Sequence, residues 1–196
     1  MEPISDGIVR YRDREISTRS EKELAGLRAG EFGFVFQQTH LVSNLTLLEN
    51  VAVAGYVSGK ETPKMVENQA ESLLEQMGVG GAKDRFPYEV SGGEAQRAAI
   101  ARAMIAKPGI LFADEPTGAL NKGSSVEVLN LLSALSQSGQ TILMVTHDIR
   151  AALRGSRILY MEDGRILDEL SIGLWQQEKE REREEQVTAW LSFLRW

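Results

Sequence analysis

Hydrophobic side chains recur along this chain at two different spacings, and each spacing predicts its own type of element. Val66, Ala70, Leu73, Leu74 and Met77 recur at helical intervals, and Gly78 follows them where a helix commonly ends. Three shorter apolar runs have the length and composition of strands. We therefore expect a helix that ends near Gly78, and strands at 32–36, 110–113 and 141–146.

The remaining segments carry local signals of turns, caps and charged helix faces. Ser124, followed three residues later by Glu127, is typical of a capping box and predicts a helix to about residue 138. Asp163 and Gly164 suit the tight turn of a hairpin. The other expected elements are strand pieces at 7–11 and 14–16, a short helix at 21–28, hairpin strands at 157–162 and 165–170, and a charged helix at 175–196 whose aromatic end, with Trp190 and Trp196, folds back on the domain.

Length, charge and composition limit the function classes. With 196 residues the chain is about one domain, and it has no cysteine, so nothing indicates a disulfide-stabilised secreted protein. The net charge of −6 argues against a nucleic-acid binder that depends on phosphate neutralisation. No apolar run approaches the roughly 18 to 20 residues of a membrane span, and the first residues lack the apolar region of a signal peptide. We therefore expect any membrane role to be peripheral.

The segment from residue 91 to 115 carries the strongest chemical signal. Ser91, Gly92 and Gly93 open a run of good helix formers that stops at Pro108. They are therefore expected at a helix N-terminus, where free N–H groups and the positive end of the dipole attract an anion. The next strand delivers Asp114 and Glu115 to its carboxyl end, where open parallel sheets bind ligands. Of these carboxylates, the first suits Mg²⁺ and the second suits a water that attacks phosphorus.

These motifs resemble the ATP-binding subunits of ABC transporters, in the branch that serves lipoprotein release and macrolide export. The signature motif is identified in Val90-Ser91-Gly92-Gly93-Glu94, and the Walker B motif with its catalytic glutamate in 110–115. The glycine pair alone is equally typical of a turn that leads into a helix, but here both motifs occur together at the family's spacing. The resemblance implies that Glu115 is catalytic, that Asp114 binds Mg²⁺, and that Ser91, Gly92, Gly93 and Glu94 contact ATP.

Three further positions match the family pattern in part or in full. By position after the strand at 32–36, Gln37 is identified as the Q-loop glutamine, a nucleotide contact and Mg²⁺ ligand in the family; the alternative is a polar loop residue after a buried strand. His147 follows a strand as the family's second catalytic residue does, and the resemblance implies a contact with the γ-phosphate and the attacking water. The segment 116–121 is similar to the D-loop except that Asn121 replaces the usual aspartate.

One expected motif does not occur within the 196 residues. A P-loop nucleotide-binding protein carries G-x-x-x-x-G-K-[ST], whose amides and lysine hold the phosphates. The nearest segment, 55–61, is one residue short and ends in Glu61. Because the resemblance covers about residues 7–196, we expect an N-terminally truncated ATPase that binds ATP more weakly than a complete subunit, with unpaired strand edges and an uncovered apolar sheet face.

Together these patterns predict an α/β fold of the P-loop NTPase type, with a parallel sheet and an inserted helical subdomain. We expect the ATPase domain at 1–170, its helical subdomain at about 45–107, and a C-terminal amphipathic helical tail at 171–196. The resemblance implies ATP and Mg²⁺ as cofactors, and a membrane permease and a second ATP-binding subunit as partners, without nucleic acid, at the cytoplasmic inner face of the membrane. Two alternatives stay open: a non-catalytic pairing subunit that supplies only its signature motif, and a chromosome-maintenance or DNA-repair ATPase head.

Overall fold

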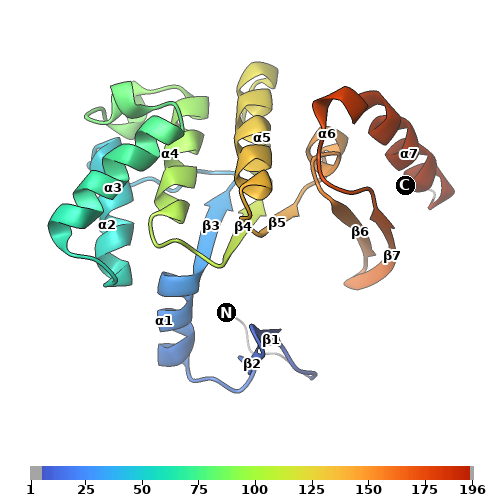
Figure 1. Cartoon of the computed structure of the whole chain (residues 1–196), viewed down its shortest axis with the longest axis horizontal. Coiled ribbons are helices and arrows are strands. Elements are labelled where there is room, and N and C mark those ends of the chain that lie inside the picture. Colours follow the sequence, from blue (N-terminus) through green and yellow to red (C-terminus); the bar gives the residue numbers. More distant parts are fainter. Residues whose placement is uncertain (1–5, 195–196) are drawn as a thin grey trace.

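The computed structural model describes residues 6–194 (Figure 1). A short parallel sheet lies in the middle of the molecule, a group of helices lies on one side of it, and a β-hairpin with a terminal helix lies on the other. Within the described residues, no helix is both long enough and apolar enough to cross a bilayer.

The central sheet contains three parallel strands in the order β3-β4-β5. These are β3 (Phe32–Phe36), β4 (Ile110–Asp114) and β5 (Ile142–Val145), which confirms the three strands expected from the apolar runs. The register pairs Phe36 with Asp114 and Asp114 with Val145, so the three strands end in one row. Whatever follows these strands in sequence is therefore brought to the same edge of the sheet.

The helical group contains α2 (Leu47–Ser58), α3 (Pro63–Gln76) and α4 (Gly92–Met104), with short 3-10 turns at Gly80–Ala82 and Pro87–Glu89. The stripe predicted on α3 is confirmed, since Val66, Ala70, Leu73 and Leu74 are all buried. Gly78 has a positive φ of 71°, as expected for the residue that ends this helix. Leu41, which precedes α2, is partly buried and packs against this core.

The two faces of the sheet are buried to different extents. Leu111 and Ala113 belong to the buried core together with residues of α4 and of α5 (Lys122–Gln137). The opposite face carries Phe34 and Phe112, whose rings stack at 5.4 Å. On β5, which ends the sheet in the described part of the chain, Leu143 is 48% and Val145 is 61% exposed. This face is therefore partly open in the described residues, most of all at β5.

Three short elements precede the sheet. The strands β1 (Arg10–Tyr11) and β2 (Arg14–Glu15) form a two-stranded pair, and α1 (Glu21–Glu31) leads directly into β3.

The start of α5 differs from the prediction, because the expected capping box of Ser124 and Glu127 is wrong. Asn121 caps α5 instead, because its side-chain oxygen accepts the N–H of Ser124 at 3.0 Å.

The C-terminal group contains α6 (Ile149–Ala152), β6 (Arg157–Glu162), β7 (Arg165–Ser171) and α7 (Glu180–Phe193), with a 3-10 turn at Gln177–Lys179 before α7. The predicted hairpin is confirmed, and both of its turn residues, Asp163 and Gly164, have positive φ. The predicted helix from 175 is wrong at its start. Trp175 instead lies buried before the helix, with the guanidinium groups of Arg154 and Arg183 4.1 and 5.5 Å from the centre of its ring.

The tail folds back on the hairpin, as the aromatic end of the chain predicted. The indole N–H of Trp190 donates to Asp168 at 2.9 Å, and its ring meets that of Tyr160 edge to face. Val187 is fully buried in a small cluster with Leu153 and Trp175. Trp196, which the prediction included, lies outside the described residues.

Candidate functional site

The carboxyl edge of the sheet collects four of the residues predicted from sequence. Gln37 follows β3, Asp114 ends β4 and Glu115 comes directly after it, and His147 follows β5 by two residues. Because β3, β4 and β5 are parallel and in register, these residues share one edge. Gln37, Asp114 and His147 are exposed there, while Glu115 is partly buried.

Glu115 and His147 form a fixed pair at this edge. The Glu115 carboxylate accepts the backbone N–H of His147 at 2.8 Å, and its Oε1 also lies 2.7 Å from Nδ1 of the His147 ring. Its second oxygen accepts the hydroxyl of Thr146 at 3.1 Å. The His147 side chain is 81% exposed, against 18% for Glu115. The glutamate is thus held by its neighbours, and the imidazole remains open to a bound group.

The backbone at Glu115 is also held in place. Its φ of 44° lies in the left-handed region, which is costly for a residue with a side chain. Its N–H donates to Val145 O at 2.9 Å, and its carbonyl accepts the N–H of Gly118 at 3.0 Å. Two main-chain hydrogen bonds therefore fix the turn that aims this carboxylate along the sheet edge.

Gln37 reaches the segment that follows Glu115. A Cβ added at Gly118 would come within 3.0 Å of Gln37 Nε2, so this contact needs glycine or a shift of the amide. A groove of about 590 Å³ opens beside the pair of Glu115 and His147. Its walls come from the segment after β4, the start of α5 and the segment after β5: Thr117, Gly118, Leu120, Lys122, Ser125, Asp148, Ile149 and Arg150.

The signature residues lie at the N-terminus of α4, as predicted. Ser91 caps the helix by accepting the N–H of Glu94 at 3.3 Å, and the Glu94 carboxylate accepts the N–H of Ser91 at 2.8 Å. The Ser91 hydroxyl also donates to Glu94, and these hydrogen bonds lower the pKa of the Glu94 carboxyl. Gly93 packs against α5, where an added Cβ would lie 2.7 Å from the Ser124 hydroxyl. In the described chain no hydrogen bond joins this cap to Glu115 or His147.

Sequence reasoning missed two residues of α4 that contact the segment around Gln37. Gln96 is 1% exposed and donates from Nε2 to the carbonyl of Phe36 at 3.0 Å. Arg102 donates to the carbonyls of Thr39 and His40 at 2.7 and 2.6 Å, and burial lowers the pKa of its guanidinium. One signal in the sequence could have identified Gln96, because it is a polar residue among the alanines of this helix. No sequence signal could have identified the backbone carbonyls to which Gln96 and Arg102 donate.

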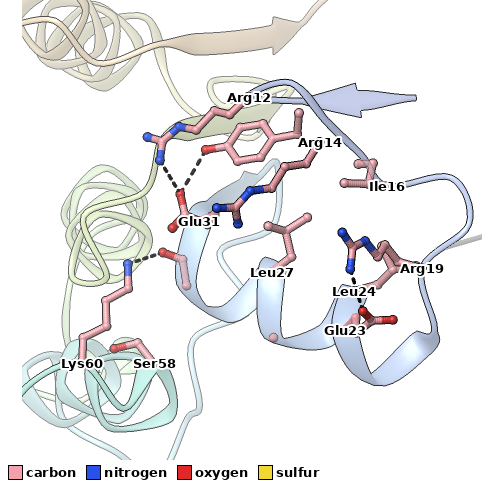
Figure 2. A pocket seen from close by; sticks show the side chains of 13 residues that line it. Arg12, Arg14, Ile16, Arg19, Glu23, Leu24, Leu27, Glu31, Ser58 and Lys60 are labelled. Atoms are coloured by element: carbon pink, nitrogen blue, oxygen red, sulfur yellow. Dashed lines mark hydrogen bonds and ion pairs between the residues drawn. The ribbon is translucent and has the colours of Figure 1, made fainter. Parts of the chain in front are cut away.

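A second hollow lies at the N-terminal side of the molecule. It measures about 600 Å³ and lies between β1, β2, α1 and the end of α2 (Figure 2). Four of its charged groups form two pairs, since Arg12 contacts Glu31 at 3.0 Å and Arg19 contacts Glu23 at 2.8 Å. None of the predicted site residues lines this hollow.

The predicted metal ligands do not form a dense cluster. Among residues 6–194 no group of three or more histidine, cysteine, aspartate or glutamate side chains is placed to hold a metal ion. The predicted Mg²⁺ ligands Gln37 and Asp114 are instead an amide and a carboxylate on neighbouring strands. Their roles stay predictions, as do those of the other site residues.

Several known proteins are similar to this chain in sequence or in structure. The ABC transporter family pattern matches residues 1–118. The macrolide export ATP-binding/permease protein MacB of Pasteurella multocida is 43% identical over 167 residues, which are 85% of this chain and 26% of MacB. The lipoprotein-releasing system ATP-binding protein LolD of Aquifex aeolicus is 41% identical, over 85% of this chain and 74% of LolD.

A solved structure agrees with these relatives. The ATP-binding cassette MJ0796, in a dimeric post-hydrolysis state bound to ADP and Pi, is 33% identical with a TM-score of 0.77, and the match covers 87% of this chain and 75% of that one. The chain thus spans about a quarter of MacB and about three quarters of LolD and of the cassette. On these matches, the chain belongs to the ABC transporter family and is homologous to the family's ATP-binding domains.

Proposed function

We propose that this chain is an ATP-binding subunit of an ABC transporter, in which binding and hydrolysis of ATP drive transport across a membrane. The observation that carries the proposal is the fixed pair of Glu115 and His147, joined at 2.7 and 2.8 Å on the same sheet edge as Gln37 and Asp114. The domain boundaries expected from the sequence, 1–170 with helices at about 45–107 and a tail at 171–196, form part of this proposal.

Gln37 and Asp114 are the residues proposed to hold Mg²⁺. Both offer oxygen atoms, which this cation prefers, and both are exposed at neighbouring strand ends. The position of the Gln37 amide next to Gly118 fits this role, because it lies beside the turn that follows Asp114. When bound, Mg²⁺ neutralises charge that develops on the phosphates.

Glu115 is the proposed general base for the attacking water. Its carboxylate is already oriented by Thr146 and by the backbone of His147, so little reorganisation is needed before it accepts a proton. The exposed ring of His147 is the proposed donor to the terminal phosphate of ATP. Both residues flank the groove of about 590 Å³, which gives the reacting groups a place to meet.

The signature residues are proposed to complete the site of a second ATP-binding subunit. The cap formed by Ser91 and Glu94 is complete within this chain, and Ser91 and Gly92 are exposed. The free N–H groups at the start of α4 can therefore receive the phosphates of a nucleotide held by another subunit. The partners in this proposal are that subunit, identical or not, and a membrane permease at the cytoplasmic face of the membrane.

Titration calorimetry with Mg-ATP tests the nucleotide site. We expect binding by the native sequence and a loss of affinity of roughly tenfold or more for Asp114→Asn, which keeps the shape but removes the charge that attracts Mg²⁺. Asp163→Asn, a carboxylate in the distant hairpin turn, is the matched control and should bind as the native chain does. Equal affinity in Asp114→Asn and the native chain would contradict the proposed Mg²⁺ ligand.

The exposed, self-capped signature favours a second candidate, a pairing subunit that lends only Ser91, Gly92 and Gly93 to a partner's nucleotide. The two candidates predict opposite results in an assembly with a catalytically intact ATP-binding subunit. For the pairing subunit, Ser91→Trp removes ATP hydrolysis by the assembly and Glu115→Gln leaves it nearly unchanged. For the catalytic subunit, Glu115→Gln removes the share of hydrolysis that this chain contributes.

A further inference from the structure

The segment from Phe36 to His40 is attached to α4 by side chains at two levels of that helix. Gln96, near the start of α4, donates to the carbonyl of Phe36 at 3.0 Å. Arg102, near its end, donates from two nitrogens to the carbonyls of Thr39 and His40 at 2.7 and 2.6 Å. Gln37 lies between these attachment points. Its backbone is thus held by α4 on both sides, although α4 lies about 60 residues away in sequence.

The first attachment, through Gln96, buries a polar side chain that is only partly hydrogen-bonded. Gln96 is 1% exposed, and its Oε1 has no hydrogen-bond partner among the described groups. A buried amide oxygen without a partner destabilises the fold, so an apolar side chain of similar size would suit this position better for stability alone. The bond to Phe36 O is what the glutamine provides and what methionine or leucine would not.

The second attachment holds a strained backbone. His40 has a φ of 48°, a region that residues with side chains rarely adopt, and its ring packs edge to face on Phe36 at 5.3 Å. Such a conformation persists only where its surroundings hold it. The guanidinium of Arg102 supplies this hold through its planar fork, because it reaches two consecutive carbonyls at once.

From this geometry we propose that Gln96 and Arg102 are positioning residues, whose contacts link the Gln37 segment to α4 and hold the backbone on both sides of Gln37. The proposal rests on the proposed function, since Gln37 is taken as a ligand of Mg-nucleotide. Its consequence is that the three carbonyl contacts keep the Gln37 side chain where it can meet the nucleotide at the sheet edge.

The link itself can be tested without nucleotide. The chain has no cysteine, so Gln38→Cys and Asn44→Cys each give a single site for a nitroxide label, the first inside the attached segment and the second beyond it. In Gln96→Met and Arg102→Lys we expect the rotational correlation time of the label at 38 to fall roughly twofold or more, with no change at 44. Gln69→Met is the matched control, because Gln69 also donates an amide N–H to a carbonyl, that of Ile105 at 3.2 Å, away from this segment.

Two results of the labelling experiment would overturn the proposal. One is unchanged mobility at 38 in both variants, which would show that the contacts do not hold the segment. The other is an equal rise in mobility at 38 and 44, because Gln96 and Arg102 would then support the fold in general and not this segment. The two variants differ in chemistry, so failure of one to fold leaves the other to decide.

A double-mutant cycle tests whether the link serves Gln37. Mn²⁺ replaces Mg²⁺, and its ATP-dependent binding is followed by electron paramagnetic resonance. We expect Arg102→Lys and Gln37→Ala each to weaken binding by roughly tenfold, as loss of a ligand's support commonly does, and the double variant to be no weaker than Gln37→Ala alone. Additive losses would overturn the positioning role. If the native chain shows no ATP-dependent Mn²⁺ binding, the proposed function fails, and the label experiment still decides whether α4 holds the segment.

Discussion

Two arginines, Arg102 in the helical group and Arg183 in the C-terminal group, use the same chemistry for different ends. Each donates to backbone carbonyls, and neither has a carboxylate within ion-pair distance among the described residues. Burial lowers the pKa of both guanidinium groups. The difference lies in what is joined: Arg102 contacts two consecutive carbonyls of one loop, whereas Arg183 contacts five carbonyls in two segments, those of Leu153, Gly155, Ile172, Gly173 and Leu174.

The comparison separates a positioning contact from a structural one. Arg183 is 4% exposed and has Trp175 beside it, so its removal leaves several buried acceptors without donors. Arg102 is only partly buried, and its acceptors lie next to a predicted nucleotide ligand. We therefore expect Arg183 to dominate stability and Arg102 to dominate the behaviour of the site. The predictions that follow test this division, from the largest effect on stability to the smallest.

Arg183→Met should give the largest loss. Five carbonyls lose their donor, and with about 1 to 3 kcal/mol for each acceptor left buried and unpaired, we expect a loss of about 3 kcal/mol or more after relaxation and hydration. Urea unfolding followed by tryptophan fluorescence measures it, since Trp175 and Trp190 both lie in this region. The control is Arg181→Met, which breaks only an exposed pair with Glu185 and should cost under about 0.5 kcal/mol. Equal losses in the two variants would break the comparison.

Arg102→Met should cost less, about 1 to 2 kcal/mol, because its two acceptors can be hydrated when the donor is lost. The same urea experiment measures this loss, and Mg-ATP calorimetry should show weaker binding at the same time. Arg183→Met is expected to leave the affinity for Mg-ATP unchanged. If Arg183→Met weakens nucleotide binding as much as Arg102→Met does, the division between the two arginines is wrong.

Ser91→Ala should have the smallest effect on stability, about 1 kcal/mol for loss of a helix cap, and the effect should depend on pH. The bonds from Ser91 lower the folded pKa of Glu94 below its ordinary value of 4.5, so their contribution is complete above that value and is lost as pH falls through the lowered pKa. Thermal unfolding should therefore show a larger difference between variant and native chain at pH 7 than at pH 3. A difference that grows on acidification would contradict the sign.

The features that the sequence could predict are those whose signal is local. The strands β3, β4 and β5, the helix N-terminus at Ser91 and the turn at Asp163 carry their signal within a few residues, and all are confirmed. The roles of the site residues, and the domain boundaries, stay predictions. Because β3, β4 and β5 are parallel, the residues that follow them lie at the carboxyl edge of the sheet, where ligands of open parallel sheets are expected.

Most of the features that the sequence did not predict depend on partners that are distant in sequence. The acceptors of Gln96 and Arg102 are backbone carbonyls some 60 residues away, and carbonyls carry no sequence signal. Trp175 was expected in a helix, but stacking with Arg154 at 4.1 Å holds it outside. At α5 two local signals competed, and Asn121 provides the cap that was expected from Ser124.

The central claim is that Glu115 at the sheet edge is the base for ATP hydrolysis, and one measurement addresses it directly. Phosphate release is followed at saturating Mg-ATP, in an assembly with a second ATP-binding subunit whose own catalytic glutamate has been replaced by glutamine. Hydrolysis in this assembly can come only from the site of this chain. We predict that Glu115→Gln lowers the rate by roughly a hundredfold or more, as loss of a general base commonly does, while Glu162→Gln on β6 does not change it. An unchanged rate in Glu115→Gln would contradict the claim.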